Sequence, residues 1–164
     1  LLFYSQTQEE PTQKAPLLRF DLDLLPAGSR IQAATLRLYV PLAPSYDLRA
    51  RVQGLLRPWD ELTATWDAAA AGQAWDVPGA RGEGTDRASW ISESQHIVEG
   101  SRWYEFDVTS LAEEWGRDRQ SNYGMVLTAG AGSFDANVEA RFVSREGNGA
   151  FRPQLVVSYV LPLQ

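Results

Sequence analysis

Hydrophobic and polar residues alternate along several short stretches of this chain, which is the period of a half-buried β-strand. The clearest stretch is 34–40, where every second residue is aliphatic and the residues between are Thr35, Arg37 and Tyr39. Similar patterns predict further strands at 1–4, 17–22, 48–56, 103–108, 123–128, 138–144 and 154–160. Gly- and Pro-containing turns separate many of these stretches, so we expect antiparallel sheets.

One segment has the period of a helix instead. Residues 110–113 fit a capping box, in which Ser110 and Glu113 satisfy free N–H groups of the first turn. Leu111 and Trp115, four positions apart, share one helical face. The chain is therefore predicted to be an all-β, two-sheet sandwich of jelly-roll type with one short helix near 110–116. We expect a single domain over 1–164, with 1–16 as an N-terminal strand or arm.

Composition narrows the function classes. The 164 residues contain no cysteine, which excludes disulfides and thiolate-bound metals. A net charge of -6 argues against a nucleic-acid partner, because phosphate binding needs a basic face. No apolar run approaches the roughly 20 residues of a membrane-spanning helix.

Candidate chemistry is sparse. His96 is the only histidine, and no nucleophile motif accompanies it. Asp60 and Glu61 are expected to brace the backbone of a turn. We predict that the chain is not an enzyme and needs no cofactor. The long Gly-rich segment offers weak candidates for a Ca²⁺ site without EF-hand spacing: Asp67, Asp76 and Asp86.

The predicted strands, in their order along the chain, resemble the DNRLRE-domain family of extracellular modules. The matching phrases are LRFDL at 18–22, ATLRLYV at 34–40, WDE at 59–61, FDVTSL at 106–111, NYGMVL at 122–127, FVSRE at 142–146 and PQLVVSY at 153–159. The resemblance covers residue 17 to the end. It implies a jelly-roll module at the cell surface, related to carbohydrate-binding modules and more distantly to growth-factor propeptides.

The resemblance also implies a missing element. Members of the family usually open with a strand upstream of the segment that resembles 1–8, and that strand is absent here. A sheet edge left open in this way is expected to borrow a strand from another copy. The candidate partner-strand residues are Leu1, Leu2, Phe3, Tyr4, Val160, Leu161 and Leu163. The first hypothesis is thus a non-catalytic structural or adhesive subunit of a surface fibre or array.

The second hypothesis is a carbohydrate-binding module. Trp75, Trp90 and Trp103 lie nearest to predicted loops and are the candidates for stacking on sugar rings. The other three tryptophans, Trp59, Trp66 and Trp115, are expected to fill the core. Polar residues at one rim of the sandwich, Asp135, Asn137, Arg145 and Asn148, offer hydrogen bonds. A polysaccharide-cleaving enzyme is the weakest alternative, because it needs two carboxylates facing across a cleft.

Overall fold

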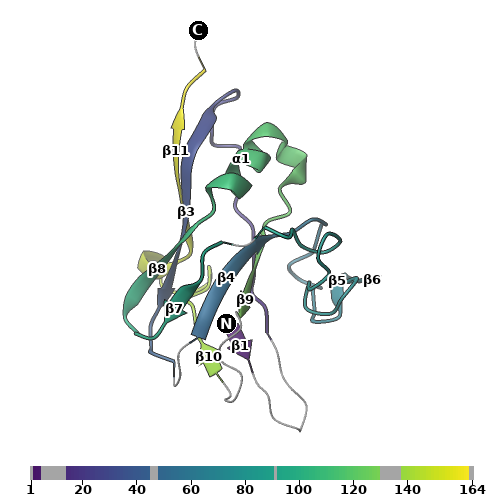
Figure 1. The fold of residues 1–164 in the computed structure, drawn as a ribbon, viewed down its shortest axis with the longest axis vertical. Coiled ribbons are helices and arrows are strands. Elements are labelled where there is room, and N and C mark those ends of the chain that lie inside the picture. Colours follow the sequence, from purple (N-terminus) through teal and green to yellow (C-terminus); the bar gives the residue numbers. More distant parts are fainter. Residues whose placement is uncertain (1, 5–13, 45–47, 91, 130–137, 163–164) are drawn as a thin grey trace.

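A computed structural model describes residues 2–4, 14–44, 48–90, 92–129 and 138–162. Two antiparallel sheets lie face to face, which confirms the predicted all-β sandwich (Figure 1). The first sheet has the strand order β11–β3–β8, formed by Gln154–Val160, Arg30–Val40 and Arg102–Asp107. The second has the order β2–β9–β4–β7, formed by Leu17–Leu18, Met125–Ala129, Leu48–Gly54 and Gln95–Ile97.

Two small antiparallel pairs complete the strands. They are β1 (Leu2–Tyr4) with β10 (Val138–Ala140), and β5 (Ala68–Ala70) with β6 (Gln73–Ala74). The helical elements are α1 (Thr109–Arg117) and the 3-10 turns η1 (Arg119–Ser121) and η2 (Gly149–Phe151). Among the described residues, no helix has the length and apolar character needed to cross a membrane.

The core lies between the two sheets and follows the alternation of β3. Leu36 pairs with Phe106 of β8, and Leu38 pairs with Tyr104. All four side chains are at most 5% exposed. Burying a side chain of this size contributes roughly 1.5–3 kcal/mol, so this strand pair is a main source of the sandwich's stability.

The helix forms where predicted, but the predicted capping box does not. Helix α1 begins at Thr109, and no side chain caps its N-terminus from Val108. Instead the Asp107 carboxylate accepts the Thr109 backbone N–H at 2.9 Å, and the bonds from Thr109 lower the Asp107 pKa. The Thr109 hydroxyl accepts the Ala34 N–H at 3.0 Å. The helix start is therefore tied to β3, while Leu111 and Trp115 are buried as predicted.

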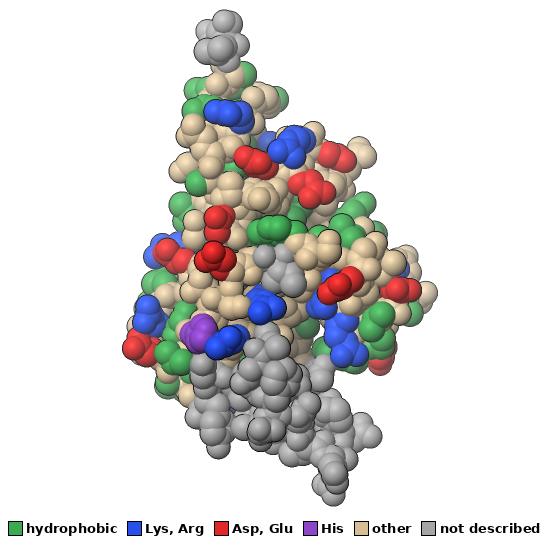
Figure 2. Space-filling model, viewed as in Figure 1, with side chains coloured by type: hydrophobic (Ala, Val, Ile, Leu, Met, Phe, Trp, Pro, Cys, Tyr) green, Lys and Arg blue, Asp and Glu red, His purple; other side chains and the backbone are tan. Residues whose placement is uncertain are grey.

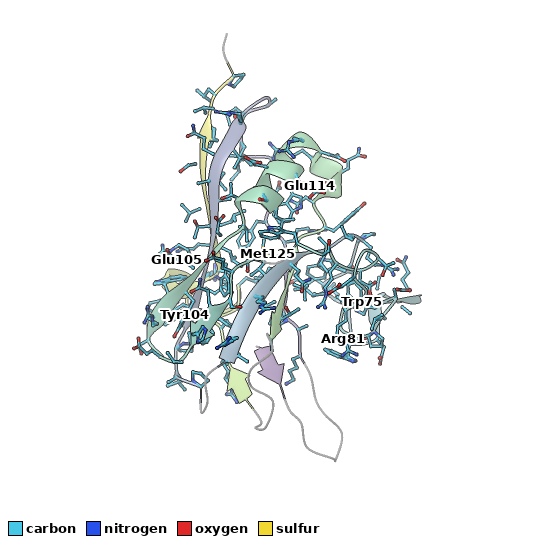
Figure 3. The ribbon with its side chains drawn as sticks, viewed as in Figure 1. Trp75, Arg81, Tyr104, Glu105, Glu114 and Met125 are labelled. Carbon is cyan, nitrogen blue, oxygen red and sulfur yellow. The ribbon has the colours of Figure 1, made fainter. Side chains whose placement is uncertain are left out.

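Residues 55–88 form a separate lobe beside the sandwich (Figure 1), the right-hand feature that carries β5 and β6. The lobe has a small core of its own, which Val126 of β9 joins: Leu55, Ala69, Trp75, Ala80 and Val126. Figure 3 shows Trp75 within the lobe and Met125 between the sheets. The only strands of the lobe within the described residues are the short β5 and β6. Its conformation is stabilised mainly by turns and by side-chain hydrogen bonds.

One side of the sandwich remains open. Strands β7 and β8 lie next to each other on one side. On the opposite side, between β2 and β11, no pairing of the two sheets occurs within the described residues. Phe20, Leu155 and Val157 pack against the core there but stay half-buried. We call this side the open flank.

The residues predicted to form a partner strand lie at two places in the fold. Leu2–Tyr4 pairs in register with Val138–Ala140 of the same chain, so this segment already has a partner without a second copy. Val160 ends β11 and pairs with Arg30, and Leu161 beyond it is exposed. Leu1 and Leu163 lie outside the described residues.

Candidate functional site

One buried carboxylate organises the lobe. The Asp86 side chain is fully buried and accepts backbone N–H groups from Asp76 at 2.9 Å, Val77 at 2.9 Å and Gly82 at 3.0 Å. Arg57 forms an ion pair with it at 3.4 Å. Burial alone would raise the Asp86 pKa, but these bonds outweigh burial and hold the pKa below its usual value.

Trp59 is fixed at the beginning of the lobe. Its indole N–H donates to the Tyr123 carbonyl at 2.8 Å. The next residue, Asp60, accepts the backbone N–H of Thr63 at 2.9 Å and its hydroxyl at 2.8 Å, which closes a tight turn. The Thr63 hydroxyl bond is the main reason why the Asp60 pKa is lowered. The half-buried Trp59 ring is thereby held at a defined angle.

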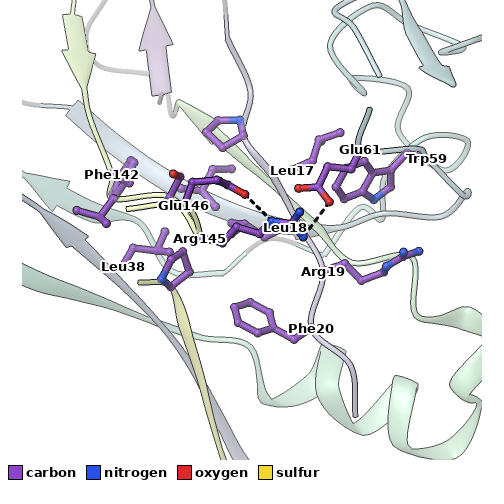
Figure 4. A pocket seen from close by; sticks show the side chains of 15 residues that line it. Leu17, Leu18, Arg19, Phe20, Leu38, Trp59, Glu61, Phe142, Arg145 and Glu146 are labelled. Atoms are coloured by element: carbon purple, nitrogen blue, oxygen red, sulfur yellow. Dashed lines mark hydrogen bonds and ion pairs between the residues drawn. The ribbon is translucent and has the colours of Figure 1, made fainter. Parts of the chain in front are cut away.

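Two hollows adjoin at this tryptophan. The first, of about 400 Å³, opens between the sheets on the open flank and reaches the buried Leu38 (Figure 4). The second, of about 410 Å³, lies between β2 and the lobe and is lined by Trp66 and Trp75. Leu17, Trp59 and Glu61 line both hollows. We call the combined depression the edge groove.

Charged side chains cross the first hollow. The Arg145 guanidinium pairs with Glu61 at 3.0 Å and with Glu146 at 2.6 Å (dashed lines in Figure 4). The hydrogen bond with Glu146, followed by the charge of Glu61, raises the Arg145 pKa, and the same bond lowers the Glu146 pKa. Since Glu61 belongs to the lobe and Arg145 follows β10, this cluster joins two distant parts of the chain.

The edge groove thus combines aromatic walls with donors and acceptors. Trp59 and Phe20 present apolar ring surface, and Trp66 lines the second hollow with Arg81 over its ring at 5.5 Å. Arg145 donates hydrogen bonds, and the Glu61 carboxylate accepts them. Ligand pockets of a few hundred Å³ with apolar walls and a few fixed polar groups are the usual form of a small-molecule site.

The predicted stacking residue Trp103 lies elsewhere, on the outer face of the first sheet. Tyr39 meets it edge-on at 5.4 Å, and Phe151 stacks on Tyr39 at 4.2 Å. Arg37 covers the Trp103 ring at 4.9 Å and is held there by Glu105 at 2.9 Å. These rings mostly contact each other or Arg37, which leaves little free aromatic face.

The other two predicted stacking residues are not brought together with Trp103. Trp75 is 5% exposed, and its indole N–H donates to the Thr65 carbonyl at 3.1 Å. A ring so buried offers no face to a sugar, so Trp75 is a core residue of the lobe that forms the base of the second hollow. Trp90 is 37% exposed and lies in the segment that runs beside β4 before β7.

The aspartates considered for Ca²⁺ do not converge. Asp86 uses its oxygens on N–H groups, Asp76 accepts the Thr85 hydroxyl at 2.8 Å, and Asp67 is exposed. In the part of the chain that the structure describes, no three His, Asp or Glu side chains are grouped so as to hold a metal ion.

Sequence analysis missed the tryptophans that line the groove. Trp59 and Trp66 were expected in the core, like Trp115, but both are only half-buried. Glu61 was expected to brace the backbone, a role that Asp60 fills alone, while Glu61 pairs with Arg145. The spacing of Asp60 and Thr63, typical of an Asx turn, is the sequence signal that could have indicated a fixed Trp59, and it was not used.

A model of carbohydrate-binding module family 96 matches residues 1–159. No curated protein matches the chain.

Proposed function

Because the chain belongs to carbohydrate-binding module family 96, we propose that it is a non-catalytic module that binds a polysaccharide in the edge groove. The observation that carries this proposal is the position of Trp59. Its ring is half-buried, anchored through its indole N–H, and lies where the two hollows meet. A fixed ring stacks on a sugar without the entropy cost of ordering a mobile side chain.

The charged cluster supports the same proposal. A sugar ring carries hydroxyl groups that both donate and accept hydrogen bonds. The Arg145 guanidinium and the Glu61 carboxylate offer both kinds of partner within one ion pair. Two adjoining hollows suit a chain of sugar units better than a single compact ligand.

We place the polysaccharide-binding site in the edge groove rather than on the outer face of the first sheet. There, Arg37 already occupies the ring of Trp103, and Tyr39 is stacked on Phe151. A sugar would have to displace one of these contacts. We therefore assign the Trp103 cluster to packing on the sheet surface.

An extracellular location accompanies this function, since modules of this kind act on polysaccharides outside the cell. The fibre subunit predicted from sequence stays a prediction. Its N-terminal strand pairs along one edge with β10 of the same chain.

The test is a binding screen against a panel of soluble polysaccharides by affinity electrophoresis, followed by calorimetry on the best ligand. We expect Arg145→Ala to weaken binding at least tenfold without changing the melting temperature, because its side chain is 70% exposed. Arg117→Ala is the matched control: this arginine is 73% exposed and ion-paired to Glu113, far from the groove in sequence.

Trp59→Ala and Trp103→Ala distinguish the two faces. Loss of binding in Trp59→Ala with binding kept in Trp103→Ala supports the groove. The reverse pattern, or a chain that binds none of the polysaccharides, overturns the proposal.

A further inference from the structure

Strand β11 forms one margin of the first sheet (Figure 1), and its pairing has one irregularity, a register shift between Ser158 and Tyr159 at which β3 carries the extra residue, Gln32. Edge strands normally carry charges, bulges or prolines that block further pairing. None of the seven residues of β11 is charged, although 22% of the chain is. Prolines occur only outside it, at Pro153 and Pro162. Within the described residues, β11 pairs with β3 alone.

The hydrogen bonds of β3 determine which N–H and C=O groups of β11 point away from the sheet. The N–H and C=O of Ala34 bond to Thr109 and Val108, on the side away from β11. Hydrogen-bonding direction alternates along a strand, so Thr35 directs its groups toward β11, where it faces Val156. Leu155 and Val157, the neighbours of Val156, therefore direct their N–H and C=O groups to the free edge.

The side chains of β11 are unusually exposed for their type. Leu155 and Val157 point inward opposite Leu36 and Ala34, yet both are only half-buried. Val156 is 50% exposed, and Tyr159 and Val160 are each 39% exposed. Hydrophobic side chains reach the surface near the C-terminal end (Figure 2). The open flank thus leaves apolar surface on both faces of this strand.

We propose that β11 is a self-association strand, on which a second copy of this chain pairs antiparallel. With Val157 at the centre, the two Val157 residues face each other and Leu155 faces Tyr159 of the other copy. Leu155 and Val157 direct their backbone groups to the free edge, and because the extra residue at the register shift lies on β3, the same alternation continues along β11 to Tyr159. The hydrogen-bonding registers of the two copies therefore match. The pairing joins two three-stranded sheets into one of six strands.

A second copy fits this edge better than a charged peptide. Two uncharged strands place no like charges opposite each other. The arrangement has twofold symmetry, so it closes at a dimer rather than growing into a fibre. The inference is independent of polysaccharide binding.

The experiment is sedimentation equilibrium of the chain over increasing concentration. We expect a reversible dimer. Val156→Lys places two lysines diagonally across the new strand pair, and we expect it to weaken the dimer at least tenfold. Leu62→Lys is the matched control, since Leu62 is 92% exposed and lies in the lobe.

Val157→Pro is the second variant. It removes an N–H that faces the free edge, the one place where a sheet tolerates proline, and should also give a monomer. Hydrogen exchange of the Leu155 and Val157 amides should slow with concentration in the wild type and not in Val156→Lys. A wild type that stays monomeric up to about 1 mM, where even a weak dimer would be populated, overturns the proposal. So does a dimer that survives Val156→Lys, or growth into longer polymers.

Discussion

Replacing Asp86 by asparagine tests how the lobe is held together. Oxygen Oδ1 accepts the Asp76 N–H and the Arg57 guanidinium, and Oδ2 accepts the N–H groups of Val77 and Gly82. An asparagine keeps one oxygen and turns its NH₂ toward the remaining donors. In either orientation, two of the four interactions are lost.

The magnitude follows from those two losses. A hydrogen bond to a charged group contributes about 1.5–3 kcal/mol, and a buried donor left unpaired costs about 1–3 kcal/mol. We expect Asp86→Asn to lower the free energy of unfolding by roughly 3 kcal/mol, which in a domain of this size lowers Tm by roughly 6–12 °C. Near-UV circular dichroism should change as well, because Trp75 packs in the same lobe.

The pH dependence gives an independent check. The Asp86 pKa is lower in the folded chain than in the unfolded chain, so its contribution is present at neutral pH and is lost as the pH falls below about 4. Chemical denaturation gives the free energy of unfolding at each pH. Between pH 7 and pH 3 this free energy should decrease less in Asp86→Asn than in the wild type. Asp67→Asn, an exposed aspartate of the same lobe, is the control. A Tm for Asp86→Asn within two or so degrees of the wild type, with an unchanged spectrum, would refute this reasoning.

Three further substitutions test the packing. Phe106→Ala leaves a cavity at a fully buried core position and should lower the free energy of unfolding, measured by chemical denaturation, by about 3–5 kcal/mol. A decrease under about 1 kcal/mol would mean that the two sheets move together and fill the cavity. Gly79→Ala should lower the free energy of unfolding by about 1–3 kcal/mol and alter tryptophan fluorescence, because φ is 79° and a Cβ would lie 2.4 Å from the Trp66 ring. Unchanged fluorescence would contradict this expectation. Thr109→Val should cost about 1–3 kcal/mol in thermal unfolding, since the Ala34 N–H loses its acceptor, whereas a neutral effect would indicate that water replaces the hydroxyl.

The sandwich was predictable where burial follows a short period. Strand β11 occupies the predicted range 154–160, and β3 contains the predicted alternation at 34–40. Strand β2 is much shorter than the predicted 17–22. Alternation indicates which face is buried, but strand length depends on the partner. Pairing ends where Leu18 meets Met125, and beyond it the Asn122 side chain takes over by donating to the Phe20 carbonyl at 2.8 Å.

The groove was less predictable, because no periodic pattern describes the lobe. Trp75 was favoured as a ligand contact for its distance from predicted strands, yet it is buried by a fold built around Asp86. Three of the four bonds to Asp86 come from backbone N–H groups, which no residue type in the sequence identifies. Arg145 was among the predicted rim residues, but its pairing with Glu61 joins positions 84 residues apart (145 minus 61).

The two ends of the lobe lie side by side, since Ala88 donates to the Gly54 carbonyl at 2.8 Å and Leu55 bridges to Arg87. The free-energy cost of closing a loop rises only slowly with its length. The lobe can therefore be exchanged for a longer or shorter insert while the strands that anchor it keep their pairing. Because the lobe forms one wall of the edge groove, exchanging the lobe would change which ligand the groove prefers while the two sheets stay as they are.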